Sequence, residues 1–237
     1  MPLATAAQIV DVALWRFAQG GLETPTKEIA QRAYVSTGHL FRTFPTKQAL
    51  LDACYMHVVA QLAAPLLAGA GQPRERYERL QAQLRRWWTL PAQVALAQPH
   101  LFDFWRLYRT RPRSVSGPAP LLGPFEPVPA LIEQVVAQRR LTLRPGLRPS
   151  LLGPSLAGQW TAAVDLVLSE LAGPANRTQQ EQLLEQAFLG WWQSLGLSDF
   201  TEVALPPKDA PSAPPARSLF WLAVQHYLAT GQAPPPS

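Results

Sequence analysis

Apolar side chains recur at spacings of three and four residues along almost the whole chain. No stretch alternates apolar and polar residues as a half-buried strand does. In residues 6–19, for example, the spacing places Ile9, Val10 and Phe17 on one side of a helix. A chain with this pattern can form a core only by packing helix on helix. We therefore expect an all-α fold.

Prolines divide this helical pattern into blocks, because proline ends or kinks a helix. The 25 prolines of the 237 residues cluster around residues 112–129, 145–154, 206–215 and 234–236. We expect an N-terminal domain at 1–46 and a helical domain at 47–205. Residues 206–237 are expected to form a proline-rich linker and one extra apolar helix, at 217–230, which should dock on the C-terminal domain.

Composition narrows the classes of function. The formal net charge of +5 favours a polyanionic partner without proving one. Cys54 is the single cysteine, and the four histidines have no metal-ligand spacing, so neither a metal nor another cofactor is expected. The first eight residues lack the features of a signal peptide, and no uninterrupted apolar run reaches the roughly 18–20 residues of a membrane span. We expect a cytoplasmic protein with no membrane partner.

Two glycine-containing segments invite an enzymatic interpretation. Residues 153–158 contain a serine between glycines, but the spacing differs from G-x-S-x-G, and no strand precedes it. Residues 69–71 lack the third glycine of a dinucleotide site. We therefore expect no enzyme.

The first 60 residues predict a helix-turn-helix. Short helices at 26–33 and 37–44 follow the supporting helix at 6–19, and a long fourth helix begins at 45–47. Ser36 is placed to cap the helix at 37–44, and Thr24 or Thr26 to cap the helix at 26–33. In such a unit the second short helix enters the major groove of DNA.

A more specific pattern runs through the same segment. It reads Ile29-Ala30, Val35-Ser36, Gly38, Leu40-Phe41, Phe44, Pro45 and Lys47, followed by Leu50-Leu51. These residues resemble the signature of the TetR family of transcriptional repressors. The resemblance covers about the first 60 residues, and beyond them it concerns the helical architecture alone. It implies a homodimeric, ligand-responsive repressor that binds a palindromic operator in double-stranded DNA and is released by a small, mainly apolar effector.

The resemblance also implies which residues meet DNA. The candidates are Thr26, Ser36, Thr37, Gly38, His39, Phe41, Arg42, Thr43 and Lys47. Lys47 begins the fourth helix, where its ammonium and the free N–H groups of the helix end can face one phosphate. His39 can hydrogen-bond a base edge. Taken singly, each of these side chains could equally be an ordinary solvated residue.

Two positions depart from the family pattern. Tyr34 occupies a turn position where glycine is usual, and a positive φ there costs a non-glycine residue roughly 1 kcal/mol or more. Phe41 replaces a typical tyrosine, so the hydroxyl available for a phosphate is lost.

Helical bundles of this kind hold ligands between their helices. The effector candidates are Tyr55, Trp87, Trp88, Phe102, Trp105, Arg109 and Trp160. Tryptophans more often fill cores, and arginines at helix ends also bind the last carbonyls. The arginines near Arg109 nevertheless leave room for an anionic group on the effector.

Dimerisation is expected where residues 152–171 and 178–196 pair with their copies as a four-helix interface. The candidates are Trp160, Val164, Leu168, Leu184, Phe188, Trp191 and Trp192. The alternative to the whole interpretation is a helical protein-interaction or scaffold protein with a vestigial helix-turn-helix.

Overall fold

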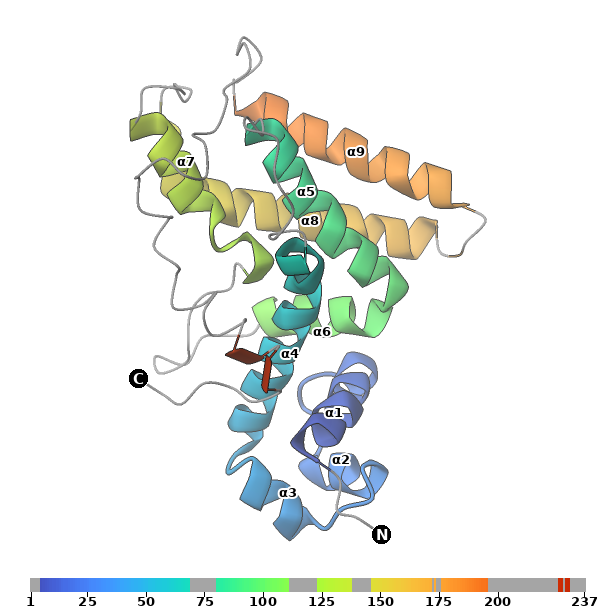
Figure 1. Ribbon diagram of the computed structural model, residues 1–237. Helices are drawn as coiled ribbons and strands as arrows, with labels where there is room; N and C mark the ends of the chain where they lie inside the picture. The colour runs from blue at the N-terminus through green and yellow to red at the C-terminus, as the bar shows by residue number, and fades with distance from the viewer. Residues whose placement is uncertain are drawn as a thin grey trace. The chain divides into compact units, whose positions relative to one another are not determined.

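The computed structural model describes residues 5–68, 80–110, 123–137, 146–171, 173, 176–195, 226–227 and 229–230. Within these ranges the chain is helical and contains no strand (Figure 1), so the all-α expectation is confirmed. The helices are α1 (Ala6–Gly20), α2 (Thr26–Arg32), α3 (Thr37–Thr43), α4 (Lys47–Ala68), α5 (Leu80–Ala97), α6 (Pro99–Thr110), the 3-10 turn η2 (Gly123–Phe125), α7 (Val128–Ala137), α8 (Pro149–Glu170) and α9 (Arg177–Ser194). The expected linker at 206–215 lies outside the described residues, as does most of the helix expected at 217–230.

The described elements form two compact units, and the division falls inside α4 between Gln61 and Leu62. The first unit contains α1, α2, α3, most of α4, α6 and the described residues near the C-terminus. The second contains the end of α4 together with α5, η2, α7, α8 and α9. Each unit has its own core.

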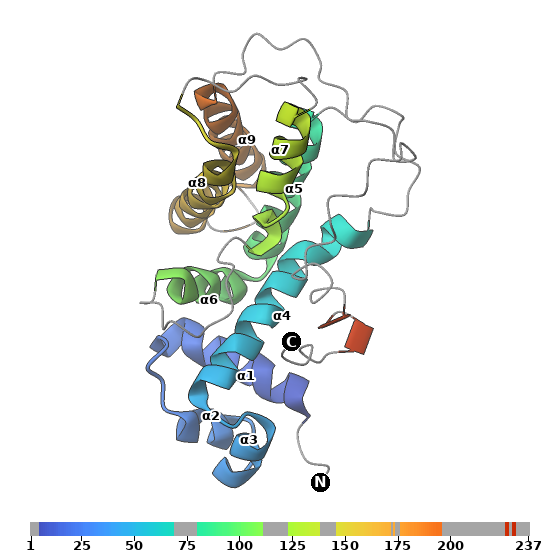
Figure 2. The same cartoon turned by 90° about the vertical axis from the view of Figure 1, so that its left-hand side faces the viewer.

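The core of the first unit lies where α1 packs on α2 and α6 (Figure 2). Ile9, Leu14 and Phe17 of α1 are completely or almost completely buried. Phe17 meets Phe104 of α6 with ring centroids 6.1 Å apart. The apolar period read from residues 6–19 thus marks the face that α1 buries, because positions three and four apart share one side of a helix.

Cys54 of α4 is also fully buried in this unit. Its thiol lies 3.9 Å from the carbonyl oxygen of Val10 on α1. Burial, and then the nearby carboxylates of Asp11 and Asp52, raise the pKa of the thiol well above its ordinary value. The thiol is therefore protonated at neutral pH and acts as a small apolar side chain.

The second unit is built around three aromatic side chains from three helices. Trp88 of α5, Trp160 of α8 and Phe188 of α9 are all buried. The indole N–H of Trp160 donates to the carbonyl of Trp88 at 2.9 Å. Pro91 lies three residues further along α5 and has no N–H of its own to offer the helix. The bond from Trp160 therefore ties α8 to α5 near a point where the hydrogen bonding of α5 is interrupted.

Helices α8 and α9 lie side by side in both views (Figure 1 and Figure 2). Their connection is short, so the two helices run in opposite directions. The buried seam between them includes Leu184 and Trp191. Trp191 also donates its indole N–H to Ser155 Oγ at 3.2 Å.

Residues Lys47–Leu66 of α4 are long and apolar enough to cross a membrane by length and composition alone. More than half of the apolar window is buried inside the protein. That burial is typical of the core helix of a globular domain.

Candidate nucleic-acid interface

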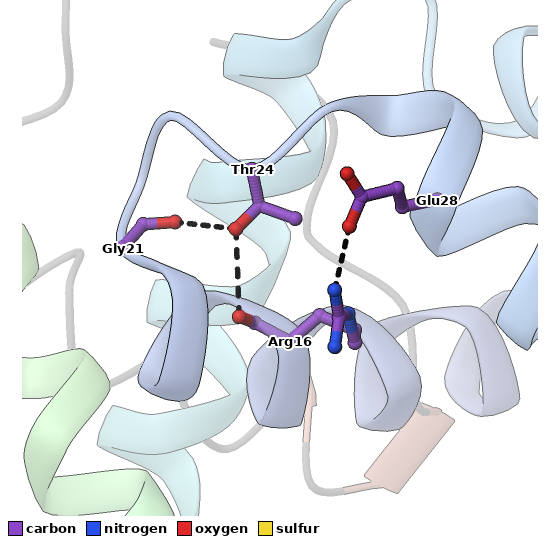
Figure 3. Close-up of polar contacts among 4 residues, drawn as sticks. All are labelled: Arg16, Gly21, Thr24 and Glu28. Carbon is purple, nitrogen blue, oxygen red and sulfur yellow. Dashed lines mark hydrogen bonds and ion pairs between the residues drawn. The ribbon is translucent and has the colours of Figure 1, made fainter.

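The loop between α1 and α2 is closed by Thr24 (Figure 3). Its hydroxyl donates to the carbonyl of Gly21 at 2.8 Å and lies 3.5 Å from the carbonyl of Arg16. We expected Thr24 or Thr26 to cap α2, and this is wrong. The N-cap residue is Pro25, and no side chain caps the helix. The hydroxyl of Thr24 instead satisfies carbonyls at the end of α1.

A second contact holds α1 against α2. The guanidinium of Arg16 forms an ion pair with Glu28 (Figure 3). Both side chains are partly exposed, so water and salt screen the pair and it contributes little to stability. It links the last part of α1 to the first turn of α2.

The turn between α2 and α3 is tight and contains a residue with unusual backbone geometry. The N–H of Val35 donates to the carbonyl of Ala30 at 3.0 Å, and the N–H of Tyr34 donates to that of Gln31 at 3.1 Å. Tyr34 has φ of 55°, in the left-handed region. The turn thus keeps the geometry that glycine would give it, with a tyrosine in that place.

Helix α3 begins at the predicted cap. Ser36 is extended, and its Oγ accepts the backbone N–H of His39 at 3.1 Å. This confirms Ser36 as the N-cap of α3. Leu40 is the fully buried anchor that holds the helix on the domain.

The opposite face of α3 carries the predicted DNA contacts. Thr37, Gly38, Phe41 and Arg42 are exposed, and His39 and Thr43 are half-buried. The hydroxyl of Thr43 donates to the carbonyl of His39 at 3.1 Å, as threonines in helices often do. One short helix therefore presents a continuous polar surface with one half-exposed aromatic ring in it.

Lys47 and Thr46 lie at the start of α4. The N–H of Ala49 donates to Thr46 Oγ1 at 2.9 Å, so a threonine that the sequence analysis did not single out caps this helix. The threonine just before the helical pattern was the signal for it. Lys47 Nζ is 3.5 Å from the carboxylate of Glu23, which is fully exposed. A phosphate can replace that carboxylate at little cost, because the pair is solvated.

Thr26, at the start of α2, is half-buried.

The surface of this domain holds one further contact that the sequence did not suggest. The guanidinium of Arg32 on α2 lies 5.6 Å from the ring centroid of Trp15 on α1. Trp15 is 39% exposed, and the contact keeps part of its ring covered.

The effector candidates fall into two groups, one in each compact unit. In the first unit the ring of Tyr55 stacks on that of Trp105, with centroids 6.0 Å apart, and Phe102 is fully buried. The guanidinium carbon of Arg109 lies over the ring of Trp105, 5.2 Å from its centroid. Burial lowers the pKa of the Arg109 guanidinium from its ordinary value, although the group remains a cation at neutral pH.

The second group comprises Trp87, Trp88 and Trp160. Trp88 and Trp160 are buried, and the indole N–H of Trp160 donates to the backbone carbonyl of Trp88. Trp87 lines a small pocket, of about the volume of one water molecule, with Leu66, Gln83 and Arg86. Among the described residues, Nε1 of Trp88 and Nε of Arg85 are buried without a hydrogen-bond partner. These two donors come from the same turn of α5.

The dimer candidates need a correction on physical grounds. Five of the seven are buried inside the protomer: Trp160, Val164, Leu184, Phe188 and Trp191. A side chain without exposed surface contributes little area to a partner, so these residues hold α8, α9 and their neighbours together. Leu168 and Trp192 are half-buried. The outward apolar residues of α8 are Leu151, 53% exposed, and Leu166, 47% exposed.

Near the C-terminus, Tyr227 is buried at 7% exposure. Its phenol oxygen lies 3.1 Å from Nδ1 of His57 on α4. We expected this segment to dock on the helical domain at 47–205, and Tyr227 contacts His57, which lies in that range. Both residues belong to the compact unit that also contains α1 to α3.

The fold and the N-terminal site together define a helix-turn-helix protein, in which α5, α7, α8 and α9 form the core of a second unit. Residues 9–54 match the family described as bacterial regulatory proteins, tetR family. The similarity to this family covers the helix-turn-helix segment of the chain. The match ends within α4, so the residues that carry it are those of α1 to α3 and the first turns of α4.

A relative and two solved structures are also similar to this chain. A stretch of 81 residues is 36% identical to the HTH-type transcriptional regulator BetI from Paraburkholderia phymatum, and it spans 32% of this chain and 41% of that relative. A tetR family transcription regulator structure from Shewanella sp. PV-4 is 26% identical, with a TM-score of 0.66 over 81% of this chain and 98% of that one. The FadR regulator from Bacillus subtilis, solved with stearoyl-CoA, has a TM-score of 0.60 at 14% identity, over 78% of this chain and 99% of that one.

Proposed function

We propose that the chain is a transcriptional regulator that binds double-stranded DNA through α3 and the start of α4. The observation that carries the proposal is the polar face of α3, whose N-terminus is capped by Ser36 and whose opposite face is anchored by Leu40. A rigid helix with exposed polar side chains is what the major groove accepts. The tetR family match over residues 9–54 supports the same conclusion.

The DNA contacts divide into two kinds. Lys47 supplies a charge to a phosphate, which positions the protein without reading sequence. Thr37 and His39, near the start of α3, are placed to read base edges. Lys47→Ala should therefore weaken binding similarly on all sequences and lower the salt slope by about one. His39→Ala and Thr37→Ala should relax the preference at particular base pairs.

The test begins with DNA from upstream of the protein's own coding sequence, in a binding assay at several salt concentrations. Binding that is abolished by substitutions in α3 supports the regulator. A protein with a vestigial helix-turn-helix would bind no DNA specifically, and it would be unaffected by those substitutions. If Lys47→Ala alone removed all sequence discrimination, the division between phosphate and base contacts would be wrong.

A dimer is part of the proposal, because one recognition helix reads too few base pairs for specific binding. Two copies related by a two-fold axis would engage the two halves of a palindromic operator. The outward faces of α8 and α9 are the surface we assign to this contact. Leu166 and Leu151 give that surface its exposed apolar area.

Release by a small, mainly apolar effector completes the proposal. The two unpartnered donors on α5, Trp88 Nε1 and Arg85 Nε, support an effector that also carries an acceptor such as a carboxylate or carbonyl. The FadR regulator solved with stearoyl-CoA offers one example of an apolar ligand with an anionic group. A native mass spectrum of freshly purified protein would show any ligand that is carried through purification.

Such an effector can act only if it binds one conformation better than another. Helix α4 is the element through which we expect the change to reach α3, because it begins beside the DNA contacts at Lys47 and continues into the second unit. Candidate ligands should therefore change both tryptophan fluorescence and DNA affinity. A ligand that binds and leaves DNA affinity unchanged would contradict coupling for that ligand.

We assign the protein to the cytoplasm, where its DNA partner is, and propose no enzymatic activity.

A further inference from the structure

Tyr34 combines two properties that are seldom found together. Its φ of 55° is the only positive value among the non-glycine residues that the structure describes. Its side chain is 93% exposed, the largest exposure among the large hydrophobic side chains in the described ranges. A β-carbon in the left-handed region is unfavourable, so this position stores strain that glycine would not.

The fold gains nothing from the phenol group. The backbone N–H of Tyr34 donates to Gln31, and a glycine would make the same bond. Within the described part of the chain the Tyr34 side chain has no hydrogen bond, ion pair or ring contact. A strained residue whose side chain is idle in the folded protein points to a role outside the chain itself.

The position of Tyr34 indicates what that role is. It lies two residues before Ser36, the N-cap of α3. Tyr34 is therefore beside the N-terminus of α3, the helix that we propose enters the major groove. On α3, Phe41 is partly exposed and carries no hydroxyl. The DNA-facing surface thus lacks a phenol on the helix and has one on the adjacent turn.

We propose that Tyr34 is a DNA-contact residue whose hydroxyl donates to a backbone phosphate next to the start of α3. This inference rests on the proposed function, because it requires the duplex to lie against α3. The high exposure is what such a contact needs, since the side chain must project beyond the domain surface. The left-handed backbone fixes the direction in which the side chain leaves the turn.

The proposal makes a distinctive prediction about salt. A neutral hydroxyl that bonds a phosphate displaces no counterion, so its removal leaves the dependence of affinity on salt unchanged. The loss should be similar on all sequences, because phosphates carry no sequence information. Lys47→Ala, by contrast, should lower the salt slope.

The experiment uses the full chain and a DNA fragment that the unmodified protein binds. Tyr34→Phe removes the hydroxyl and keeps the ring, and Tyr34→Gly removes the side chain and the strain. We expect Tyr34→Phe to bind DNA about tenfold more weakly, with an unchanged salt slope and an unchanged melting temperature. Tyr34→Gly should bind at least as weakly and yet melt at a higher temperature. Trp15→Phe, at a half-exposed aromatic ring of the same domain, is the control and should bind normally.

The opposite directions of the two readouts make the test sharp. A purely structural tyrosine would give a Tyr34→Gly variant that is more stable and binds DNA as well as before, and this result would overturn the proposal. Unchanged affinity in Tyr34→Phe would likewise exclude the hydroxyl. If these variants bind normally while Lys47→Ala binds weakly, the proposed Tyr34 contact is wrong and the proposed function stands. If the unmodified protein binds no DNA, the proposed function itself fails.

Discussion

The phenol oxygen of Tyr227 lies 3.1 Å from Nδ1 of His57, and the two rings meet edge to face with centroids 5.9 Å apart. The other ring nitrogen of His57, Nε2, is 3.8 Å from the carboxylate of Asp11. One imidazole on α4 therefore joins α1 to a residue near the end of the chain.

This contact predicts that Tyr227→Phe destabilises the protein. The variant keeps the ring and its edge-to-face contact, and it removes the hydroxyl from a half-buried nitrogen. The free energy of unfolding should fall by about 1 kcal/mol, which is typical of one neutral hydrogen bond. Urea denaturation of the full chain measures it. Tyr227→Ala, which also removes the ring, should cost more, and an unchanged free energy of unfolding in Tyr227→Phe would mean that the hydroxyl contributes nothing.

The same tyrosine predicts a loss of stability in alkali. Burial raises the pKa of Tyr227 to about 12, from an ordinary value near 10. Between these two values the unfolded chain has lost the phenol proton and the folded chain retains it. Stability from this group is thus complete below pH 10 and decreases as the pH rises towards 12. Tyr227→Phe should flatten the stability profile in that range.

His57 predicts an effect of acid. Burial lowers its pKa below the ordinary value, Asp11 opposes this, and His100 adds to it. The unfolded chain therefore binds a proton at a higher pH than the folded chain does. Stability is complete above about pH 6.5 and declines as the pH falls through the folded pKa. Thermal melting of His57→Gln from pH 7.5 to 5 should show a weaker dependence than the unmodified protein, and an identical dependence would assign the effect elsewhere.

Gly20 predicts a steric effect at the end of α1. A β-carbon there would lie 2.6 Å from the hydroxyl oxygen of Thr24, which closes the loop between α1 and α2. Gly20→Ala should displace Thr24 and lower the free energy of unfolding by about 1–3 kcal/mol. Gly190→Ala on α9 is the matched control, because a β-carbon there meets nothing within 4 Å. The control should be slightly stabilising, as alanine is in a helix interior.

The exposed and buried faces of α8 and α9 predict which substitutions disrupt the dimer and which unfold the protein. Leu166→Glu places a charge on an exposed position, so it should yield folded monomers with poor DNA affinity. Phe188→Glu and Trp191→Arg place charges in the buried seam, so they should unfold the second unit instead. Analytical ultracentrifugation and circular dichroism distinguish the two results. A folded Leu166→Glu variant that stays dimeric would move the interface to another surface.

The sequence predicted best where the signal is local. The spacing of Ile9, Val10 and Phe17 identified the buried face of α1, and a serine before a short helix identified the cap of α3. Thr24 was misassigned because a threonine before a helix can bond forwards to that helix or backwards to the preceding carbonyls. Only the geometry of the loop decides between them.

Contacts between distant residues were out of reach for the sequence. Nothing in the pattern near Tyr227 names His57, which is 170 residues away. On α8 and α9 both the buried seam and parts of the outer face are apolar, so periodicity alone could not separate core residues from interface residues. The signature of the helix-turn-helix is short and local, and this is why the candidate DNA contacts could be listed before the fold was known.

The single cysteine can report local opening of the native protein. Cys54 is buried where α4 meets α1, and its thiol is protonated, so a thiol reagent can react only during an opening that exposes it. The rate of labelling under native conditions therefore measures how often α1 and α4 separate. Because no second cysteine is present, the reporter needs no engineering. A bound operator that holds α1 to α3 in place should slow the reaction.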